Sequence, residues 1–209
     1  MPLLADEFFL LAHHDVTGRA RLHPRAVGLG LASAVLAELV TAQAVVVDAG
    51  HVWVVDPTAP ADALGRSALR LLLDEPEHTS VRVWLTVLSE RAPDHVAQRL
   101  TAAGVVRPEQ VRRLMRTRTI HVPVDINLAA WPWARLSLRL RRMEPLDEPD
   151  LFLAGLAVAT GLDTYLLDGA EPEVVRHLDV LLRALRPALR DLLGQTGAAV
   201  GNAVLSGRT

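Results

Sequence analysis

The sequence predicts a mainly α-helical fold: a single globular bundle of about eight to ten helices with one or two small β-hairpins. Half of the 209 residues are hydrophobic and 22% are charged, a balance that favours a folded core over disorder. Only 4% are aromatic, and the apolar residues are mostly Leu, Val and Ala, which favours close helix packing over a β-sandwich. The length suits one domain covering residues 1–209.

Apolar residues recur every three to four positions over most of the chain, which is the spacing of a helix with one buried face. The predicted helices lie at residues 3–12, from Arg25 to about Thr41, at 62–73, from a cap at Thr79 to Leu88, from Pro93 to Gly104, and at 108–113, 131–143, 151–167, 173–193 and 198–205.

Capping and breaking residues bound several of these helices. Pro24 fits the first turn of the second helix, where a missing backbone N–H costs little. Thr79 offers an N-cap hydroxyl, and Gly104 suits a helix end because glycine adopts the left-handed cap conformation. Pro187 is expected to kink the helix over 173–193.

Two segments are predicted to be extended. Residues 44–48 and 51–55 are rich in β-branched side chains and flank Ala49-Gly50, so they predict a hairpin. Residues 115–122 alternate loosely and predict a second hairpin or an extended arm, so that a basic arm is expected at about 107–127.

One apolar segment, residues 26–47, is long enough to span a bilayer. Glu38 lies near its middle, where an acid costs about 2.5–3.5 kcal/mol on insertion scales, so we predict a buried helix that runs into a strand. Residues 1–11 carry Asp6 and Glu7 and lack the basic start of a signal peptide, which predicts a cytoplasmic protein.

The charge of the chain is concentrated in one stretch. Between Arg107 and Arg142 nine arginines stand against only Glu109 and Asp125, a local charge of +7 in a chain of net charge −2. With apolar residues between the arginines, this pattern indicates an anionic partner, either a phospholipid headgroup layer or a polyanion. An alternative remains open, in which the arginines form a solvated helix face or pair with acids elsewhere in the fold.

Nucleic acid is not expected as the partner. The net charge is negative, and the two side chains that could stack on bases, Trp131 and Trp133, are expected to be directed into the core by Pro132.

The sequence offers no catalytic constellation, cofactor site or metal site. There is no cysteine and no lysine, which excludes disulfides, Schiff bases and a P-loop lysine. All 22 basic residues are arginine, which suits bidentate phosphate contacts but is equally typical of a GC-rich genome. The only histidine cluster, His13-His14-Asp15, is interpreted as polar residues at a helix end. Binding is therefore the favoured class of function.

The order of motifs along nearly the whole chain resembles that of the Golgi phosphoprotein 3 family, in an actinobacterial-type form. The matching pieces are Leu3 to Leu11, Asp15 to Gly18, Leu36 to Leu39, the hairpin ending in Asp56-Pro57-Thr58, Ala63-Leu64, Trp84 to Ser89, Arg99 to Val105, and Arg116 to Pro123.

This resemblance implies a non-enzymatic peripheral protein on the cytoplasmic face of a membrane, which in eukaryotic members binds phosphatidylinositol 4-phosphate. The Trp and Arg positions that hold the headgroup in the family fall on His23, Ala32, Glu90 and Pro93 of this chain. A hydrophobic hairpin of the family, which assists membrane insertion and self-association, corresponds to about residues 114–123.

Two sets of residues follow from the charge and the resemblance together. Headgroup binding is assigned to Arg25, Arg91, Arg112, Arg113, Arg116 and Arg118. The membrane or oligomer hairpin is assigned to Leu114, Met115, Ile120 and Val122.

The leading hypothesis is a lipid-binding peripheral protein or adaptor whose arginine-rich surface docks on anionic headgroups. The alternatives are a protein-interaction scaffold that forms a homo-oligomer through the basic arm, and a small-molecule-binding protein of secondary metabolism.

Overall fold

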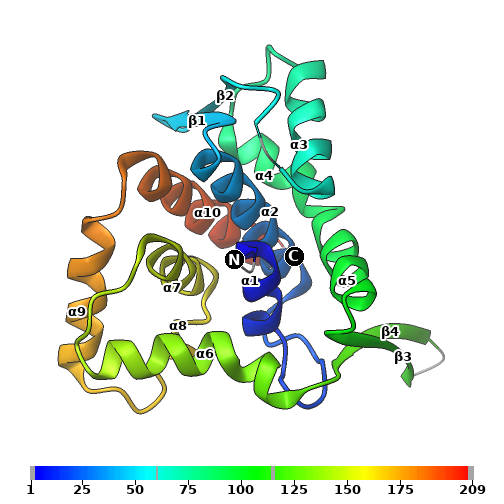
Figure 1. Ribbon diagram of the computed structural model, residues 1–209, viewed down its shortest axis with the longest axis vertical. Coiled ribbons are helices and arrows are strands. Elements are labelled where there is room, and N and C mark those ends of the chain that lie inside the picture. The colour runs from blue at the N-terminus through cyan, green and yellow to red at the C-terminus, as the bar shows by residue number, and fades with distance from the viewer. Residues whose placement is uncertain (1–2, 60, 114–115, 207–209) are drawn as a thin grey trace.

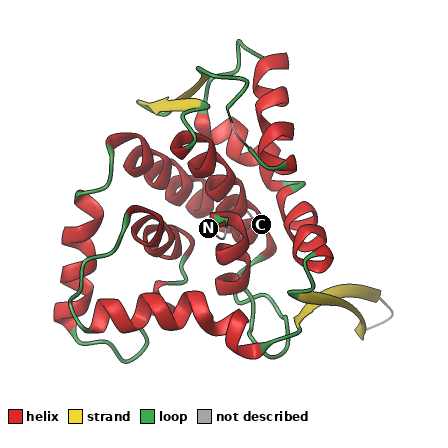
Figure 2. Ribbon diagram, viewed as in Figure 1, coloured by secondary structure: helices red, strands yellow, loops and turns green. Residues whose placement is uncertain are grey.

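The computed structural model describes residues 3–59, 61–113 and 116–206. These residues form ten helices and two separate two-stranded antiparallel sheets (Figures 1 and 2). The predicted fold class, mainly α with small hairpins, is confirmed. One domain over 1–209 stays a prediction.

The helices are α1 (Leu4–Ala12), α2 (Pro24–Thr41), α3 (Ala63–Asp74), α4 (Val81–Ser89), α5 (Ala92–Ala102), α6 (Ile126–Arg141), α7 (Glu148–Thr160), α8 (Asp163–Leu166), α9 (Pro172–Arg183) and α10 (Pro187–Ser206). The strands are β1 (Val45–Asp48), β2 (His51–Val54), β3 (Val106–Arg113) and β4 (Arg116–Pro123).

Helix α2 is the centre of the bundle. It is buried on all sides by α1, α4, α7 and α10, which Figure 1 shows arranged around it. It is long and apolar enough to cross a membrane by length and composition, but 78% of it is buried inside the protein. The predicted buried helix, followed by the β1–β2 hairpin, is therefore confirmed.

Two glycines allow the neighbours of α2 to approach closely. A methyl group at Gly30 would lie 2.2 Å from the Phe8 ring of α1, and one at Gly28 would lie 2.7 Å from the Ser89 carbonyl oxygen at the end of α4. Both distances are too short for a side chain, so these positions require glycine for packing rather than for an unusual backbone conformation.

The predicted short helix over 108–113 is wrong, because these residues belong to β3. The ladder of β3 and β4 runs without a bulge from the Val106 and Pro123 pair to the Arg113 and Arg116 pair. The isolated segment contains only weak apolar periodicity, and pairing with β4 satisfies more backbone groups than one free helical turn would. The expected hairpin over 115–122 is therefore longer, 106–123, and Leu114 and Met115 lie outside the described residues.

Helix α6 begins five residues earlier than predicted. The Asp125 carboxylate accepts hydrogen bonds from the backbone N–H groups of Asn127, at 2.8 Å, and Leu128, at 3.4 Å, and so caps the helix. Pro132 lies inside the helix instead of near its start.

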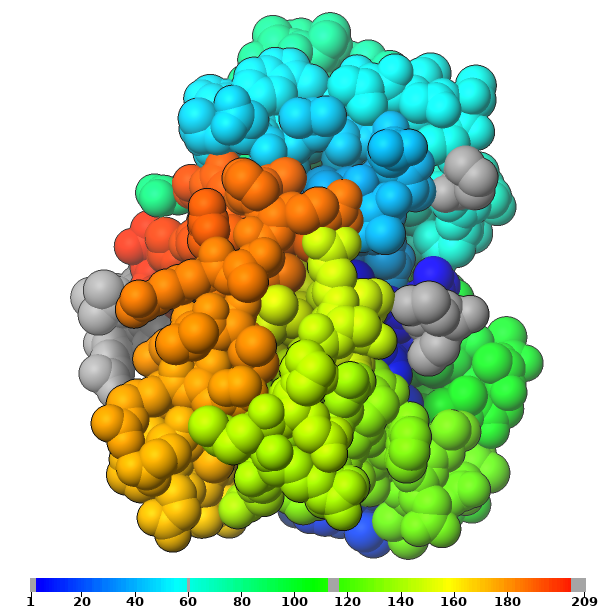
Figure 3. Space-filling model, turned by 60° about the vertical axis from the view of Figure 1, so that its left-hand side comes forward, coloured from blue at the N-terminus to red at the C-terminus, as the bar shows by residue number. Residues whose placement is uncertain are grey.

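The C-terminal boundaries also differ from the prediction. The segment 151–167 is two helices, because Gly161 adopts φ +85° and ends α7 before α8 begins. Pro187 does not kink a continuous helix but starts α10, which extends through the predicted separate helix at 198–205. The space-filling view in Figure 3, which turns the left-hand side of Figure 1 toward the viewer, shows the surface formed by α6, α7 and α9.

Part of the basic stretch lies inside this fold. Arg135 of α6 bonds the Glu7 carboxylate of α1 at 2.8 Å and the Asp150 carboxylate of α7 at 2.6 Å, and Arg139 reaches Asp150 at 3.1 Å. Glu7 and Asp150 are 6% and 4% exposed, so the ion pairs join three helices in a desolvated setting. The hydrogen bonds that Arg135 donates to Glu7, opposed by burial, raise the pKa of Arg135. For Arg135 and Arg139 the alternative of internal pairing is confirmed.

We expect Arg135→Ala to lower the free energy of unfolding by about 3–5 kcal/mol, because it leaves two buried carboxylates without their main cation. Urea denaturation followed by far-UV circular dichroism measures the change. Arg112→Ala, in the β3–β4 hairpin, is the matched control and is expected to change the free energy of unfolding by less than about 0.5 kcal/mol. Similar losses in both variants would contradict the distinction between internal and arm arginines.

Candidate functional site

The β3–β4 hairpin projects from the helical body beyond the end of α5 (Figure 1). We call residues 106–123 the arm. Arg112 and Arg118 are exposed, and neither has an ion-pair partner within the described part of the chain. Arg113 and Arg116 face each other at the last described pair of the ladder. Ile120 is half-buried and Val122 is buried, so these two side chains anchor the arm and do not offer a hydrophobic tip.

The fold brings Arg25 and Arg91 to the same end of the α2–α4 pair. Gly28 and Ser89 pack against each other, Arg25 lies one turn before Gly28, and Arg91 follows Ser89 by two residues. Both arginines are exposed. The sequence places them 66 positions apart along the chain, so only the close packing of two helices groups them.

The base of the arm adjoins this end of the helices. Asp94, in the first turn of α5, is near enough to His121 of β4 to act on its pKa. The loop after α1 also contacts β4, because Gly18, at φ +63°, lies against the His121 carbonyl group, where a methyl group would come within 2.1 Å. The arm, Arg91 and the loop after α1 therefore share one end of the molecule.

Two histidines at this base are held neutral. Burial lowers the pKa of His13 to about 4, although its Nδ1 donates a hydrogen bond to the Phe9 carbonyl oxygen at 2.7 Å. Burial also lowers the pKa of His121, against the opposing charge of Asp94. Because neither imidazole is protonated at neutral pH, the positive charge of the arm comes from arginine alone.

Exposed apolar residues continue directly from the arm into α6. Val124, Ile126, Leu128 and Trp131 are 61%, 51%, 47% and 56% exposed. We call these four the apolar shoulder. The expectation that Pro132 directs Trp131 into the core is wrong, since capping by Asp125 starts α6 earlier and leaves Trp131 on its outer face. Only Trp133 turns inward, where its Nε1 donates to the Tyr165 carbonyl oxygen at 3.2 Å.

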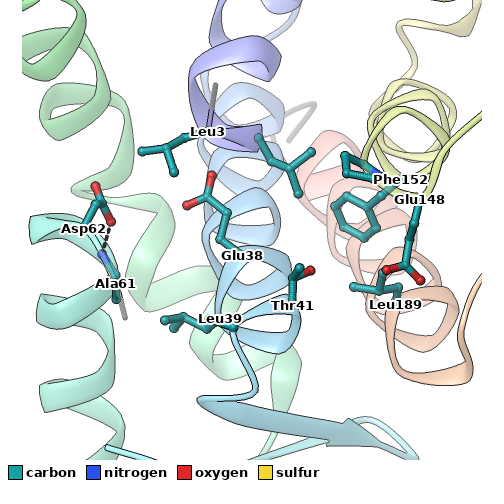
Figure 4. A pocket seen from close by; sticks show the side chains of 13 residues that line it. Leu3, Glu38, Leu39, Thr41, Ala61, Asp62, Glu148, Phe152 and Leu189 are labelled. Carbon is teal, nitrogen blue, oxygen red and sulfur yellow. Dashed lines mark hydrogen bonds between the residues drawn. The ribbon is translucent and has the colours of Figure 1, made fainter. Parts of the chain in front are cut away.

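A separate apolar pocket of about 480 Å³ lies on another part of the molecule, between the ends of α1, α2, α3, α7 and α10 (Figure 4). None of its lining residues is among the site residues predicted from the sequence. Three acids line it, Glu38, Asp62 and Glu148, and the Oε1 of Glu38 accepts a hydrogen bond from the Ala5 backbone N–H at 2.9 Å. Burial raises the pKa of Glu38 from 4.5 to about 7, against the lowering effect of the Ala5 N–H and Arg99. A lone acid within the long apolar segment 26–47 is the sequence signal that could have indicated this site.

Among the described residues, one group of side chains has the spacing of metal ligands. Glu75, Glu77 and His78, all exposed, bring their ligating atoms within 4.8 Å of one another. Exposed acids often lie this close without an ion, so the group does not by itself define a metal site.

Together these features define a mainly helical protein with a cationic hairpin arm and an adjoining exposed apolar surface. The family model described as Golgi phosphoprotein 3 (GPP34) matches residues 4–197, nearly the whole chain, and the chain therefore belongs to this family. No curated protein matches the sequence significantly.

Glu38 makes the stability of the protein depend on pH. Because its pKa rises from 4.5 in the unfolded chain to about 7, the folded protein keeps a proton that the unfolded chain releases. The stability that protonated Glu38 contributes is therefore lost as pH rises from 4.5 to 7. Between these two pH values we expect the free energy of unfolding of Glu38→Gln to fall by about 1–3 kcal/mol less than that of the wild type.

Urea denaturation at a series of pH values tests this expectation. His13 has the opposite effect, since below 6.5 the unfolded chain binds a proton that buried His13 takes up only at about 4, but it is present in both proteins. Glu90→Gln, at an exposed position, is the matched control. Parallel pH profiles for wild type and Glu38→Gln would show that Glu38 is solvated.

Proposed function

We propose that this protein is a non-enzymatic peripheral membrane protein or adaptor that binds anionic lipid headgroups through the arm, Arg25 and Arg91. The observation that carries the proposal is the position of the arm arginines. Arg112 and Arg118 are exposed without ion-pair partners in the described chain, on an arm whose base continues into the exposed apolar shoulder, whereas Arg135 and Arg139 are used internally. Membership of the Golgi phosphoprotein 3 family supports the proposal.

The apolar shoulder favours a lipid surface over a soluble polyanion. Exposed Trp and aliphatic side chains gain free energy by entering the boundary between headgroups and acyl chains, and arginines beside them contact the phosphates. Each arginine near an anionic surface contributes about 1 kcal/mol, so four on the arm contribute about 4 kcal/mol, or roughly a thousandfold in membrane partition.

The proposal does not extend to one phosphoinositide. The family headgroup positions hold His23, Ala32, Glu90 and Pro93 in this chain, and Arg25 and Arg91 lie beside them. Arg25 and Arg91 supply positive charge beside these positions, but the family's own headgroup residues are not retained, so we propose attraction to anionic lipids in general and not to one headgroup. The cytoplasmic face of the membrane, which is rich in anionic lipid, is the proposed location.

We expect replacement of Arg112, Arg113, Arg116 and Arg118 by Gln to reduce partition onto anionic vesicles by about a hundredfold to a thousandfold. Co-flotation measures it, with vesicles of neutral phosphatidylcholine alone, with added phosphatidylserine or cardiolipin, and with added phosphatidylinositol 4-phosphate, at low and physiological salt. The charge-matched control replaces four exposed arginines elsewhere, Arg70, Arg176, Arg183 and Arg190. Equal losses in both variants would reduce the effect to net charge, and no flotation of the wild type would refute lipid binding.

We expect Ile126→Ser combined with Trp131→Ser to weaken flotation about tenfold to a hundredfold, and most visibly at high salt, where the arginine contribution is screened. The control is Leu73→Ser with Val180→Ser, since both are exposed apolar residues outside the shoulder. If the shoulder variant binds like its control, the contact with lipid is purely electrostatic and the apolar part of the proposal fails.

Self-association through the arm is the competing function that the same region supports, because among the described residues neither strand of its two-stranded sheet pairs with a further strand. Sedimentation equilibrium of a chain lacking residues 107–122 separates the two. Loss of mass on removing the arm supports the scaffold, while unchanged mass with lost flotation supports lipid binding.

A further inference from the structure

The pocket beside Glu38 shares no residue with the arm or the apolar shoulder. Its walls come from the start of α1, the end of α2, the start of α3 and the starts of α7 and α10. Figure 4 shows Glu38 near the centre, with Leu3 and Asp62 to one side of it and Phe152 and Glu148 to the other. A ligand of this pocket would therefore be a second one, independent of lipid headgroups.

Most of the lining is apolar. The side chains that supply this surface are Leu3, Leu4, Leu39, Pro149, Phe152 and Leu189. The volume, about 480 Å³, lies in the range of small-molecule sites, which typically combine apolar walls with a few oriented polar groups.

Glu38 still has hydrogen-bonding capacity toward this space. Its Oε1 accepts from the Ala5 N–H, and no partner contacts Oε2 among the described residues. Among the described residues, every fully buried side-chain oxygen or nitrogen has a hydrogen bond. Because Oε2 has none, it is not fully buried, and it is accessible from the pocket that Glu38 lines. A ligand with a hydrogen-bond donor can reach it.

The charges around Glu38 are unbalanced. Asp6 of α1 and Asp62 before α3 both bond Arg99 of α5, the first pair at 2.7 Å. Glu38 adds a third carboxyl group to this single guanidinium. Across the pocket Glu148 is already paired with Arg186 at 2.5 Å. By contrast, the cluster of Glu7 and Asp150 with Arg135 and Arg139 has equal numbers of acids and bases.

We propose that this pocket binds an amphipathic amine, with its protonated nitrogen bonded to Glu38 and its apolar body against Leu39, Phe152 and Leu189. A cation supplies the charge that the cluster lacks. A carboxylate would meet three acids at the lining, and a purely apolar molecule would desolvate Glu38 without replacing its lost water contacts.

The probes are hexyl-, octyl- and decylamine below their micelle concentrations, compared with alcohols and carboxylates of equal chain length. Isothermal titration calorimetry at a pH of about 8 measures binding to the whole protein. We expect amines to bind most tightly and carboxylates least, with amine affinity rising about threefold to fourfold per methylene. Glu38→Gln is expected to weaken octylamine about tenfold to a hundredfold and to leave octanol nearly unchanged.

The dependence on pH gives a second readout. Asp6, Asp62 and Arg99 face Glu38 from α1, α3 and α5, and Glu148 lies across the pocket on α7. Ionised Glu38 is the form that binds a cation, so octylamine affinity should fall by up to about tenfold per pH unit below 7 in the wild type. In Glu38→Gln the octylamine affinity should not depend on pH over this range, because that variant keeps the other four groups and lacks only the carboxyl group of Glu38.

Two controls complete the experiment. Glu90→Gln removes an exposed acid outside the pocket and should bind octylamine like the wild type. Ala42→Phe fills the pocket from a half-buried position and should abolish binding of amine and alcohol alike. Equal affinity for octylamine and octanol, or equal behaviour of Glu38→Gln and Glu90→Gln, would overturn the proposal. Vesicle flotation by Glu38→Gln and Ala42→Phe is expected to be unchanged, so failure here is separate from failure of lipid binding.

Discussion

Helix α2 is apolar around its whole circumference, so it is stable only when other helices cover every side of it. That requirement organises the chain, because α1, α4, α7 and α10 come from distant parts of the sequence and all pack on α2. Gly28 and Gly30 bring Ser89 and Phe8 close to its axis. The same constraint gives the molecule both candidate sites: packing at one end of α2 groups Arg25 and Arg91, and burial of the helix near its other end encloses Glu38.

Arginine performs two unrelated tasks in one stretch of sequence. Glu7 and Asp150 are desolvated in the bundle, and a desolvated carboxylate is tolerated only with a close cation, so Arg135 and Arg139 are committed to them. The arm has no buried acid, and Arg112 and Arg118 remain in solvent. The local charge of +7 therefore overstates the cationic surface, and the difference depends on which helices pack together rather than on the composition of the stretch.

The spacing of apolar residues was enough to predict most of the helices and the β1–β2 hairpin, because their periodicity is strong and local. Elements whose stability is not local were missed. Strand β3 depends on pairing with β4, which a scan of 108–113 by itself cannot reveal. Trp131 was misplaced because a proline suggested a helix start, while the Asp125 cap, one turn and a half earlier, sets the boundary. The pocket required five elements to converge, so only the isolated charge of Glu38 indicated it.

Helix α1 connects the two candidate sites. Near its start the Ala5 N–H holds Glu38, and at its end Phe9 and His13 pack at the base of the arm, where the Phe9 and His121 rings lie 6.3 Å apart. Binding at one site can influence the other only if α1 has two arrangements of similar free energy that the ligands distinguish. Glu7, between the two ends, is held by two hydrogen bonds from Arg135 in a buried setting, and moving α1 would break both. This anchor favours one arrangement of α1, and hence two sites that bind independently on a shared scaffold.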